Sequence, residues 1–255
     1  MGQYSLAFNM FSFTIASMLA AFVFFIMAQS RLAPKYRISM MVSALVVGIA
    51  GYHYWRILGS WEGAYTLTNG MYMASGQPFN DAYRYVDWLL TVPLLVVELV
   101  LVMNLEKSKQ AGLLTKLIIA SALMIALGYP GEVSDDNTTR AIWGTLSSIP
   151  FAYILVVLWG ELGKAIETQP ERPRVLLKNI RLLLLFTWGF YPIAYMGPFL
   201  GVSGAGAEVI IQVGYTIADV AAKAGYGVMI YAIARAKSEA EGWEIGSTKT
   251  VAAAS

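Results

Sequence analysis

The stretch VIIQVGYTIADVAAKAGYGVMIYAIA, residues 209–234, is an apolar run with a lysine, Lys223, in its middle. A helix needs roughly 20 apolar residues to cross a lipid bilayer, and this run is long enough. A lysine at bilayer depth costs about 2.5–3.5 kcal/mol, so we expect its amine or its charge to have a use. Asp219 lies one turn earlier on the same helix face and can neutralise that charge. The alternative is an ion pair that serves only to hold helices together.

The composition extends this interpretation to the whole chain. Of its 255 residues, 57% are hydrophobic and 13% are charged, and the mean hydropathy is +0.57, as in a polytopic membrane protein. The absence of cysteine excludes disulfides and thiolate metal sites, and a single histidine, His53, argues against a histidine metal site. The net charge of +2 gives no indication of nucleic-acid binding. Residues 1–10 lack the basic start of a cleaved signal peptide, so we expect the first apolar run to be retained.

Seven apolar segments are each long enough to cross a bilayer. They cover residues 5–30, 36–59, 82–105, 112–130, 138–163, 175–200 and 207–236. The predicted fold is therefore all-α, a seven-transmembrane-helix bundle that forms a single membrane domain over residues 1–255. In the loop 61–80, alternating residues around Asn69-Gly70 predict a short β-hairpin. Residues 238–255 are predicted to form a frayed polar tail.

The distribution of charge predicts the orientation of the bundle. Basic residues gather in the connections after the first, third and fifth spans and at the end of the seventh, for example Arg31, Lys107, Arg172 and Lys237. The alternate connections are mainly acidic. By the positive-inside rule, the N-terminus is expected outside and the C-terminus in the cytoplasm.

The third span, RYVDWLLTVPLLVVE over residues 84–98, carries polar residues on one face. Arg84, Asp87 and Thr91 follow helical spacing. Glu98 lies eleven residues after Asp87, about three turns and about 16 Å along the axis, on the same side. Ionisable residues within spans often mark proton relays; the alternative is that they only bind helices together.

The two acids of this span are expected to differ in protonation. Asp87 lies one turn from Arg84, and Lys223 would lie at a similar depth, so we expect Asp87 to be ionised. Leucine and valine surround Glu98 in the sequence with no cation in helical reach, so we expect Glu98 to hold a proton. A proton acceptor near the outside and a donor near the inside, with a cation between them, predict outward proton movement.

Three motifs together resemble those of the microbial rhodopsins. They are RYVDWLLTVP at 84–93, WGFYPIAY at 188–195 and DVAAK at 219–223. The resemblance covers about residues 5–237 and is strongest to the proteorhodopsin and xanthorhodopsin group of light-driven proton pumps. It implies that Lys223 carries all-trans retinal as a protonated Schiff base, with Asp87 and Asp219 as counterions.

The resemblance also assigns roles along the proton path. Asp87 would be the proton acceptor, Glu98 the donor, and Arg84 would direct release to the outer face. The combination of Asp87, Thr91 and Glu98 is similar to that of outward proton pumps, whereas sodium pumps of the family carry Asn, Asp and Gln there. His53 resembles a histidine that hydrogen-bonds the acceptor aspartate. The alternative for His53 is an interfacial aromatic residue at the outer end of a helix.

Aromatic residues are expected to line the retinal site. Trp188, Tyr191 and Tyr195 share one face of the sixth span, where Pro192 predicts a kink, and Trp88 follows Asp87. Flat rings on facing helices would clamp a polyene, although an aromatic stripe can also be plain packing. Leu95 matches the family position at which leucine accompanies green absorption.

A glycine in the fifth span suggests a second pigment. Gly144 lies in IWGTLSSIP, residues 142–150, where many members of the family have tryptophan. In xanthorhodopsin-like members such a gap is a window to the retinal ring, against which a carotenoid antenna lies. The resemblance thus implies a hydroxylated carotenoid beside Gly144; the alternative is a small residue for helix packing.

The sequence therefore favours a light-driven outward proton pump rather than an enzyme. Its partners would be protons and the lipids of a bacterial-type plasma membrane, which it crosses several times, and relatives form pentamers or trimers. Two alternatives remain open: a sensory photoreceptor that signals through a partner, and a seven-helix transporter without a chromophore.

Overall fold

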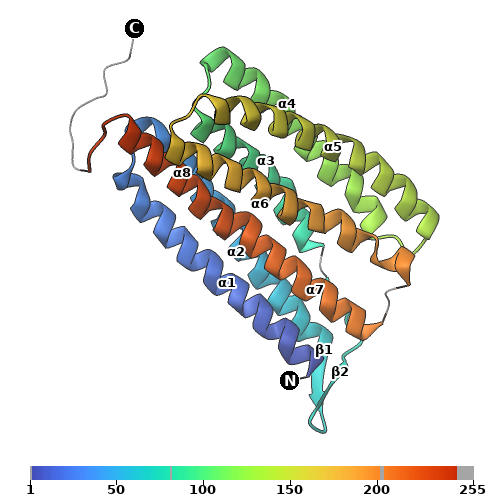
Figure 1. Cartoon of the computed structure of the whole chain (residues 1–255). Coiled ribbons are helices and arrows are strands. Elements are labelled where there is room, and N and C mark those ends of the chain that lie inside the picture. Colours follow the sequence, from blue (N-terminus) through green and yellow to red (C-terminus); the bar gives the residue numbers. More distant parts are fainter. Residues whose placement is uncertain (1, 81, 202–203, 246–255) are drawn as a thin grey trace.

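The computed structural model describes residues 2–80, 82–201 and 204–245, and in this part of the chain seven long helical segments form one bundle (Figure 1). The first six are α1 (Gln3–Ala28), α2 (Pro34–Ala64), α3 (Tyr83–Met103), α4 (Lys107–Glu132), α5 (Asn137–Glu167) and α6 (Glu171–Tyr195). The seventh consists of α7 (Ala205–Asp219), a π-helical segment (Val220–Gly225) and α8 (Tyr226–Ala240), which follow one another without a break. The predicted seven-helix fold is confirmed.

The ends of the helices differ from the predicted spans because hydropathy marks only the apolar part of a helix. Six of the long helical segments in the described chain are long and apolar enough to cross a membrane. The other is α6, which begins four residues earlier than predicted, at Glu171, and whose first turns contain Arg172, Arg174, Lys178 and Arg181. Its apolar part is correspondingly short, and a 3₁₀ turn at Gly197–Leu200 replaces its predicted last turn.

The predicted hairpin is also confirmed. Strands β1 (Tyr65–Thr68) and β2 (Met71–Ala74) pair antiparallel, with Thr68 opposite Met71. The two residues between them, Asn69 and Gly70, have positive φ angles of 51° and 78°, as a type I′ turn requires. The hairpin and the N-terminus lie at one end of the bundle, and α8 ends at the other (Figure 1).

The polar tail begins later than predicted. The last helix continues through Ser238, whose hydroxyl accepts a hydrogen bond from the main-chain nitrogen of Ala33, to Ala240. Trp243 is buried beyond it. The rest of the predicted tail, residues 246–255, lies outside the described residues.

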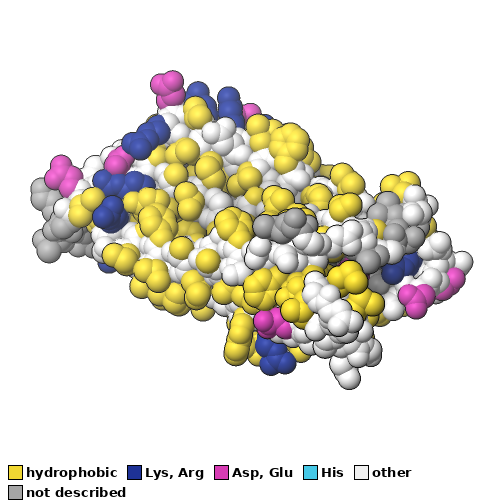
Figure 2. All heavy atoms as spheres, turned by 90° about the horizontal axis from the view of Figure 1, so that it is seen from below, with side chains coloured by type: hydrophobic (Ala, Val, Ile, Leu, Met, Phe, Trp, Pro, Cys, Tyr) yellow, Lys and Arg dark blue, Asp and Glu magenta, His cyan; other side chains and the backbone are white. Residues whose placement is uncertain are grey.

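Many apolar side chains of the bundle face outward, while several charged side chains are buried inside it. Exposed residues include Phe186, Val156 and Ile210, and hydrophobic side chains cover much of the face seen in Figure 2. By contrast Arg84, Asp87, Glu98, Asp219 and Lys223 are buried among the helices. An apolar exterior around a polar interior suits lipid rather than water as the surrounding solvent. The chain is a multi-pass membrane protein.

Candidate functional site

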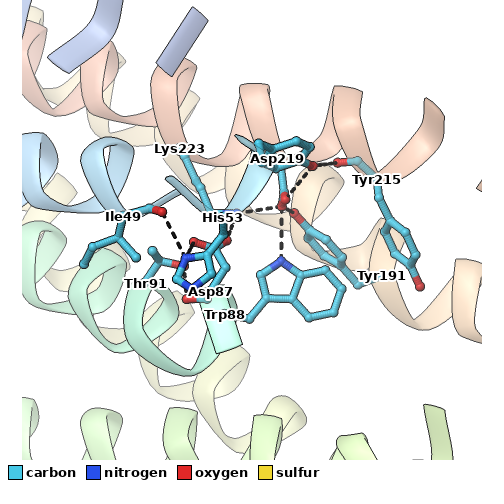
Figure 3. Close-up of polar contacts among 10 residues, drawn as sticks. Ile49, His53, Asp87, Trp88, Thr91, Tyr191, Tyr215, Asp219 and Lys223 are labelled. Carbon is cyan, nitrogen blue, oxygen red and sulfur yellow. Dashed lines mark hydrogen bonds and ion pairs between the residues drawn. The ribbon is translucent and has the colours of Figure 1, made fainter. Parts of the chain in front are cut away.

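A buried cation and two carboxylates form the centre of the bundle (Figure 3). The Nζ atom of Lys223 lies 2.7 Å from Oδ1 of Asp219 on its own helix and 3.1 Å from Oδ2 of Asp87 on α3. All three side chains are at most 2% exposed. Removing charges from water costs several kcal/mol per ion, so these groups are stable only because they are paired with each other.

The two carboxylates have different surroundings. Asp219 accepts hydrogen bonds from the hydroxyls of Tyr54 (2.8 Å) and Tyr191 (2.5 Å) and from the indole nitrogen of Trp88 (3.3 Å). The carboxylate of Asp87 accepts no hydrogen bond from the described residues; its oxygens lie 3.1 Å from Nζ of Lys223 and 3.8 Å from Nδ1 of His53. Hydrogen bonds stabilise a carboxylate as an anion. Asp219 accepts three of them, whereas the carboxylate oxygens of Asp87 accept none from the described residues.

The backbone around Lys223 is wound as a π-helix over Val220–Gly225. This winding inserts one extra residue into the turn, and such segments are frequent at functional sites. It starts directly after Asp219 and contains Lys223, so it decides how the amine is directed relative to both acids. No feature of the sequence predicted it.

His53 is placed beside Asp87 but not as predicted. Its Nδ1 atom is 3.8 Å from Oδ1 of Asp87, too far for a hydrogen bond, and 3.0 Å from the main-chain oxygen of Ile49 (Figure 3). The side chains of His53 and Asp87 are therefore neighbours without the predicted hydrogen bond. His53 is only 7% exposed, so it is also not an interfacial residue at a helix end. The Thr91 hydroxyl likewise donates to the main-chain oxygen of Asp87 (2.9 Å) rather than to its carboxylate.

On the hairpin side of the centre, polar groups continue from Arg84. Its guanidinium lies over the ring of Tyr215 at 5.2 Å and hydrogen-bonds the side-chain oxygen of Gln212. The amide nitrogen of Gln212 in turn donates to Glu208 (2.7 Å). Arg84, Gln212 and Glu208 all line a polar cavity that Glu132 also reaches. Gln212 and Glu208 were not predicted. Their spacing, one helical turn apart near the start of an apolar span, was the available signal.

On the opposite side, Glu98 is isolated. It is fully buried, the hydroxyl of Ser43 donates to one carboxyl oxygen, and the other oxygen has no hydrogen-bond partner among the described residues. No cation of the described chain lies within ion-pair distance of it. A carboxylate in such surroundings would leave charge uncompensated in an apolar medium, which favours the neutral acid.

An apolar cavity adjoins the Lys223 amine. It is lined by every residue that the sequence analysis placed in a cofactor pocket: Trp88, Leu95, Gly144, Trp188, Tyr191, Pro192, Tyr195 and Lys223. The empty space in it, including open space at its mouth, is about 890 Å³. Met124 and Phe151 of the neighbouring helices α4 and α5 complete the wall and were not predicted, because apolar residues on a span carry no distinguishing signal.

The space beside Gly144 is occupied by an aromatic ring. A Cβ atom at this position would lie 2.6 Å from Cε1 of Tyr195, closer than real Cβ contacts allow. The Tyr195 hydroxyl donates to the main-chain oxygen of Arg140 (2.7 Å), which holds the ring in place. Gly144 thus permits close approach of α6, and any larger residue would have to displace Tyr195.

Comparison with known proteins places this geometry in a family. The family of bacteriorhodopsin-like proteins matches residues 6–237. The chain is a microbial rhodopsin. This rhodopsin is 65% identical to the structure of xanthorhodopsin, described as a light-driven ion pump with dual chromophore, with a TM-score of 0.92 over 95% of this chain and 97% of that one. It is 56% identical to thermophilic rhodopsin, with a TM-score of 0.92 over 95% and 98% of the two chains. A green-light absorbing proteorhodopsin from a gamma-proteobacterium is 30% identical over 222 residues, 86% of this chain and 82% of the relative.

The unequal surroundings of the two carboxylates lead to a stability prediction. Asp219→Asn should destabilise the purified protein in detergent more than Asp87→Asn, by about 1–3 kcal/mol, because only Asp219 accepts charge-assisted hydrogen bonds. Thermal unfolding followed by circular dichroism measures this difference. Equal destabilisation, or a larger effect at Asp87, would show that the hydrogen bonds to Asp219 do not distinguish the two acids.

Proposed function

We propose that this rhodopsin is a light-driven outward proton pump whose chromophore is retinal joined to the Lys223 nitrogen. One observation carries the proposal: a buried primary amine contacts two carboxylates and lines an aromatic, apolar cavity. These residues fit a long apolar aldehyde, because the amine can form the covalent link while the walls of the cavity hold the chain. Retinal supplies light absorption and a change of shape about a double bond. The description of xanthorhodopsin as a light-driven ion pump supports the same function.

Asp87 is the acceptor of the proton that leaves the Lys223 nitrogen. The carboxylate oxygen is 3.1 Å from that nitrogen, within reach of direct proton transfer. Asp219 is closer, at 2.7 Å, but its oxygens already accept hydrogen bonds from two tyrosines, so it remains the permanent counterion. The His53 ring, whose Nδ1 atom lies 3.8 Å from Oδ1 of Asp87, adds a polar contact to the acceptor.

Glu98 resupplies the proton from the other side. Its buried, largely unpartnered carboxyl keeps a proton until the Lys223 nitrogen has lost its own. Release follows the chain of Arg84, Gln212 and Glu208 toward the hairpin end. Exporting one charge against 100 mV requires about 2.3 kcal/mol, so acceptor and donor must not exchange roles. The different surroundings of Asp87 and Glu98 prevent that exchange.

The charge pattern supports an orientation with the hairpin end outside. Ion pairs join the first turns of α2 and α6 to the end of the last helix: Lys35 lies 2.9 Å from Glu241, and Arg172 lies 2.6 Å from Glu239. The basic connections therefore belong to one end of the bundle, which the positive-inside rule places in the cytoplasm. Outward transport then runs from Glu98 to Asp87 to the hairpin end.

Gly144 is the proposed contact for a hydroxylated carotenoid antenna. The glycine is partly exposed on α5 and also lines the retinal cavity, so it connects the outside of the bundle with the inside. Tyr195 would be the ring between the two pigments. The dual chromophore of xanthorhodopsin supports this role. By the same resemblance we propose a homo-oligomer, a pentamer or a trimer.

Pigment and pumping test the function together. Cells that express the chain with all-trans retinal should form a coloured membrane that hydroxylamine bleaches, and illumination should acidify an unbuffered suspension until a protonophore is added. Colour without acidification would instead indicate a sensory photoreceptor. Absence of colour would indicate a transporter without a chromophore.

Glu98→Gln tests the donor. The return of visible absorption after a flash should slow by about 100-fold or more, the usual contribution of a positioned proton donor. Added azide, a small proton carrier, should restore part of the rate. Glu106→Gln, an exposed substitution near the start of α4, is the matched control and should leave the rate unchanged. An unchanged rate in Glu98→Gln would remove it from the path.

The antenna is tested by the action spectrum of pumping after a hydroxylated carotenoid has been added. The wild type should show a carotenoid band beside the retinal band. In Gly144→Trp the ratio of the carotenoid band to the retinal band should fall to near zero, because the large ring fills the contact. Absence of the carotenoid band in the wild type would end the antenna proposal.

A further inference from the structure

A tyrosine hydroxyl lies in the apolar region between Lys223 and Glu98. Tyr226 is the first residue of α8, one turn after Lys223, and it is only 1% exposed. Its hydroxyl is 3.4 Å from the main-chain oxygen of Leu95 on α3. Leu95 is one turn before Glu98 on the same helix, and its carbonyl is directed toward the turn on which Glu98 lies.

The distance between donor and recipient requires an intermediate group. Glu98 lies about 16 Å along α3 from Asp87, whereas the Lys223 nitrogen is only 3.1 Å from Asp87. Proton transfer needs hydrogen-bond distances of about 3 Å at each step. The buried residues on this part of α3 are apolar and have no side-chain group that can carry a proton: Leu95, Val96 and Leu99.

Other buried hydroxyls near this region are already engaged. Thr91 donates to the main-chain oxygen of Asp87 at 2.9 Å, and Thr187 donates to that of Leu183 at 2.8 Å. The Tyr226 hydroxyl has a longer contact, 3.4 Å, near the limit of a hydrogen bond. Rotation of the hydroxyl about its C–O bond therefore gives up only a weak hydrogen bond. The Glu98 carboxyl is also close enough to interact electrostatically with this phenol.

We propose that the Tyr226 hydroxyl relays the proton from Glu98 to the Lys223 nitrogen, a step that rests on the proposed pump function. The phenol oxygen accepts the proton of Glu98 as its own proton passes toward the Lys223 nitrogen. Glu98 becomes a carboxylate, the nitrogen gains one proton, and Tyr226 regains its original O–H bond. A bridging water on either side of the phenol satisfies the same balance.

Tyr226→Phe removes the relay and keeps the ring. The return of visible absorption after a flash should slow by about tenfold or more. This is less than the roughly 100-fold expected of a positioned proton donor, because water can partly replace the hydroxyl. Tyr231→Phe, the same change five residues further along α8 where the ring contacts Phe24, is the matched control and should leave the rate unchanged. A rate in Tyr226→Phe within twofold of the wild type would overturn the relay.

Comparison with Glu98→Gln separates the relay from the proposed function. If both residues act on one path, the double variant should be no slower than Glu98→Gln alone. Slow recovery in Glu98→Gln with normal recovery in Tyr226→Phe would overturn the relay and leave the pump intact. Normal recovery in Glu98→Gln would overturn the donor and the relay with it.

A second measurement needs no retinal. With ¹³C-labelled tyrosine, the Cζ signal that Tyr226→Phe removes belongs to Tyr226 and reports on its hydrogen bonding. In the chain without retinal, this signal should shift on Glu98→Gln and stay in place on Tyr231→Phe. A Tyr226 signal that is indifferent to Glu98→Gln would show that the phenol and the carboxyl do not interact, and the relay would fall.

Discussion

The contact of one lysine with two aspartates is the constraint on which the rest of the bundle depends. Lys223, Asp87 and Asp219 are all nearly inaccessible, and none could remain charged at that depth alone. Asp219 and Lys223 meet because they are one turn apart, whereas Asp87 reaches them only when α3 packs against the seventh helix. The packing of α3 against the seventh helix therefore also compensates the buried charge. The other polar groups of the interior are arranged around this contact.

The proposed direction of proton transport follows from the different surroundings of the three buried acidic residues. Asp219 is surrounded by hydrogen-bond donors, Asp87 by ion pairs alone, and Glu98 by apolar side chains and one serine. In the proposed pump, the first stays an anion, the second takes a proton, and the third supplies one. Arg84, which is buried beneath aromatic rings, continues the polar groups toward the hairpin end. A chemically uniform interior would offer no preferred direction.

Much of this could be predicted from sequence because it depends on period and composition. The seven spans, the Asn69-Gly70 turn and the shared face of Asp87 and Glu98 follow from local spacing. The π-helical segment could not be predicted, because it reflects tertiary packing around Lys223 and not a local preference. Tyr54 lies next to His53 in the sequence and was not predicted as a site residue, yet it donates to Asp219.

The predicted contacts that differ from the structure share one cause. Helical spacing predicts which face of a helix a residue occupies. The rotation of the neighbouring helix then decides, within an ångström or two, the distance between two side chains. His53 therefore lies on the predicted side but 3.8 Å from Asp87, and Tyr195 fills the gap that Gly144 leaves. Ser43 and Gln212 were missed for the same reason, since a polar residue in a span has no visible partner until the helices are packed.

The most direct test of the central claim is chemical. The illuminated pigment is treated with borohydride, which makes the link between lysine and retinal permanent, and its peptides are analysed by mass spectrometry. The account predicts a retinyl group on the peptide that contains Lys223 and on no other lysine. A retinyl group on a different lysine, or a coloured protein with no modified lysine, would contradict it.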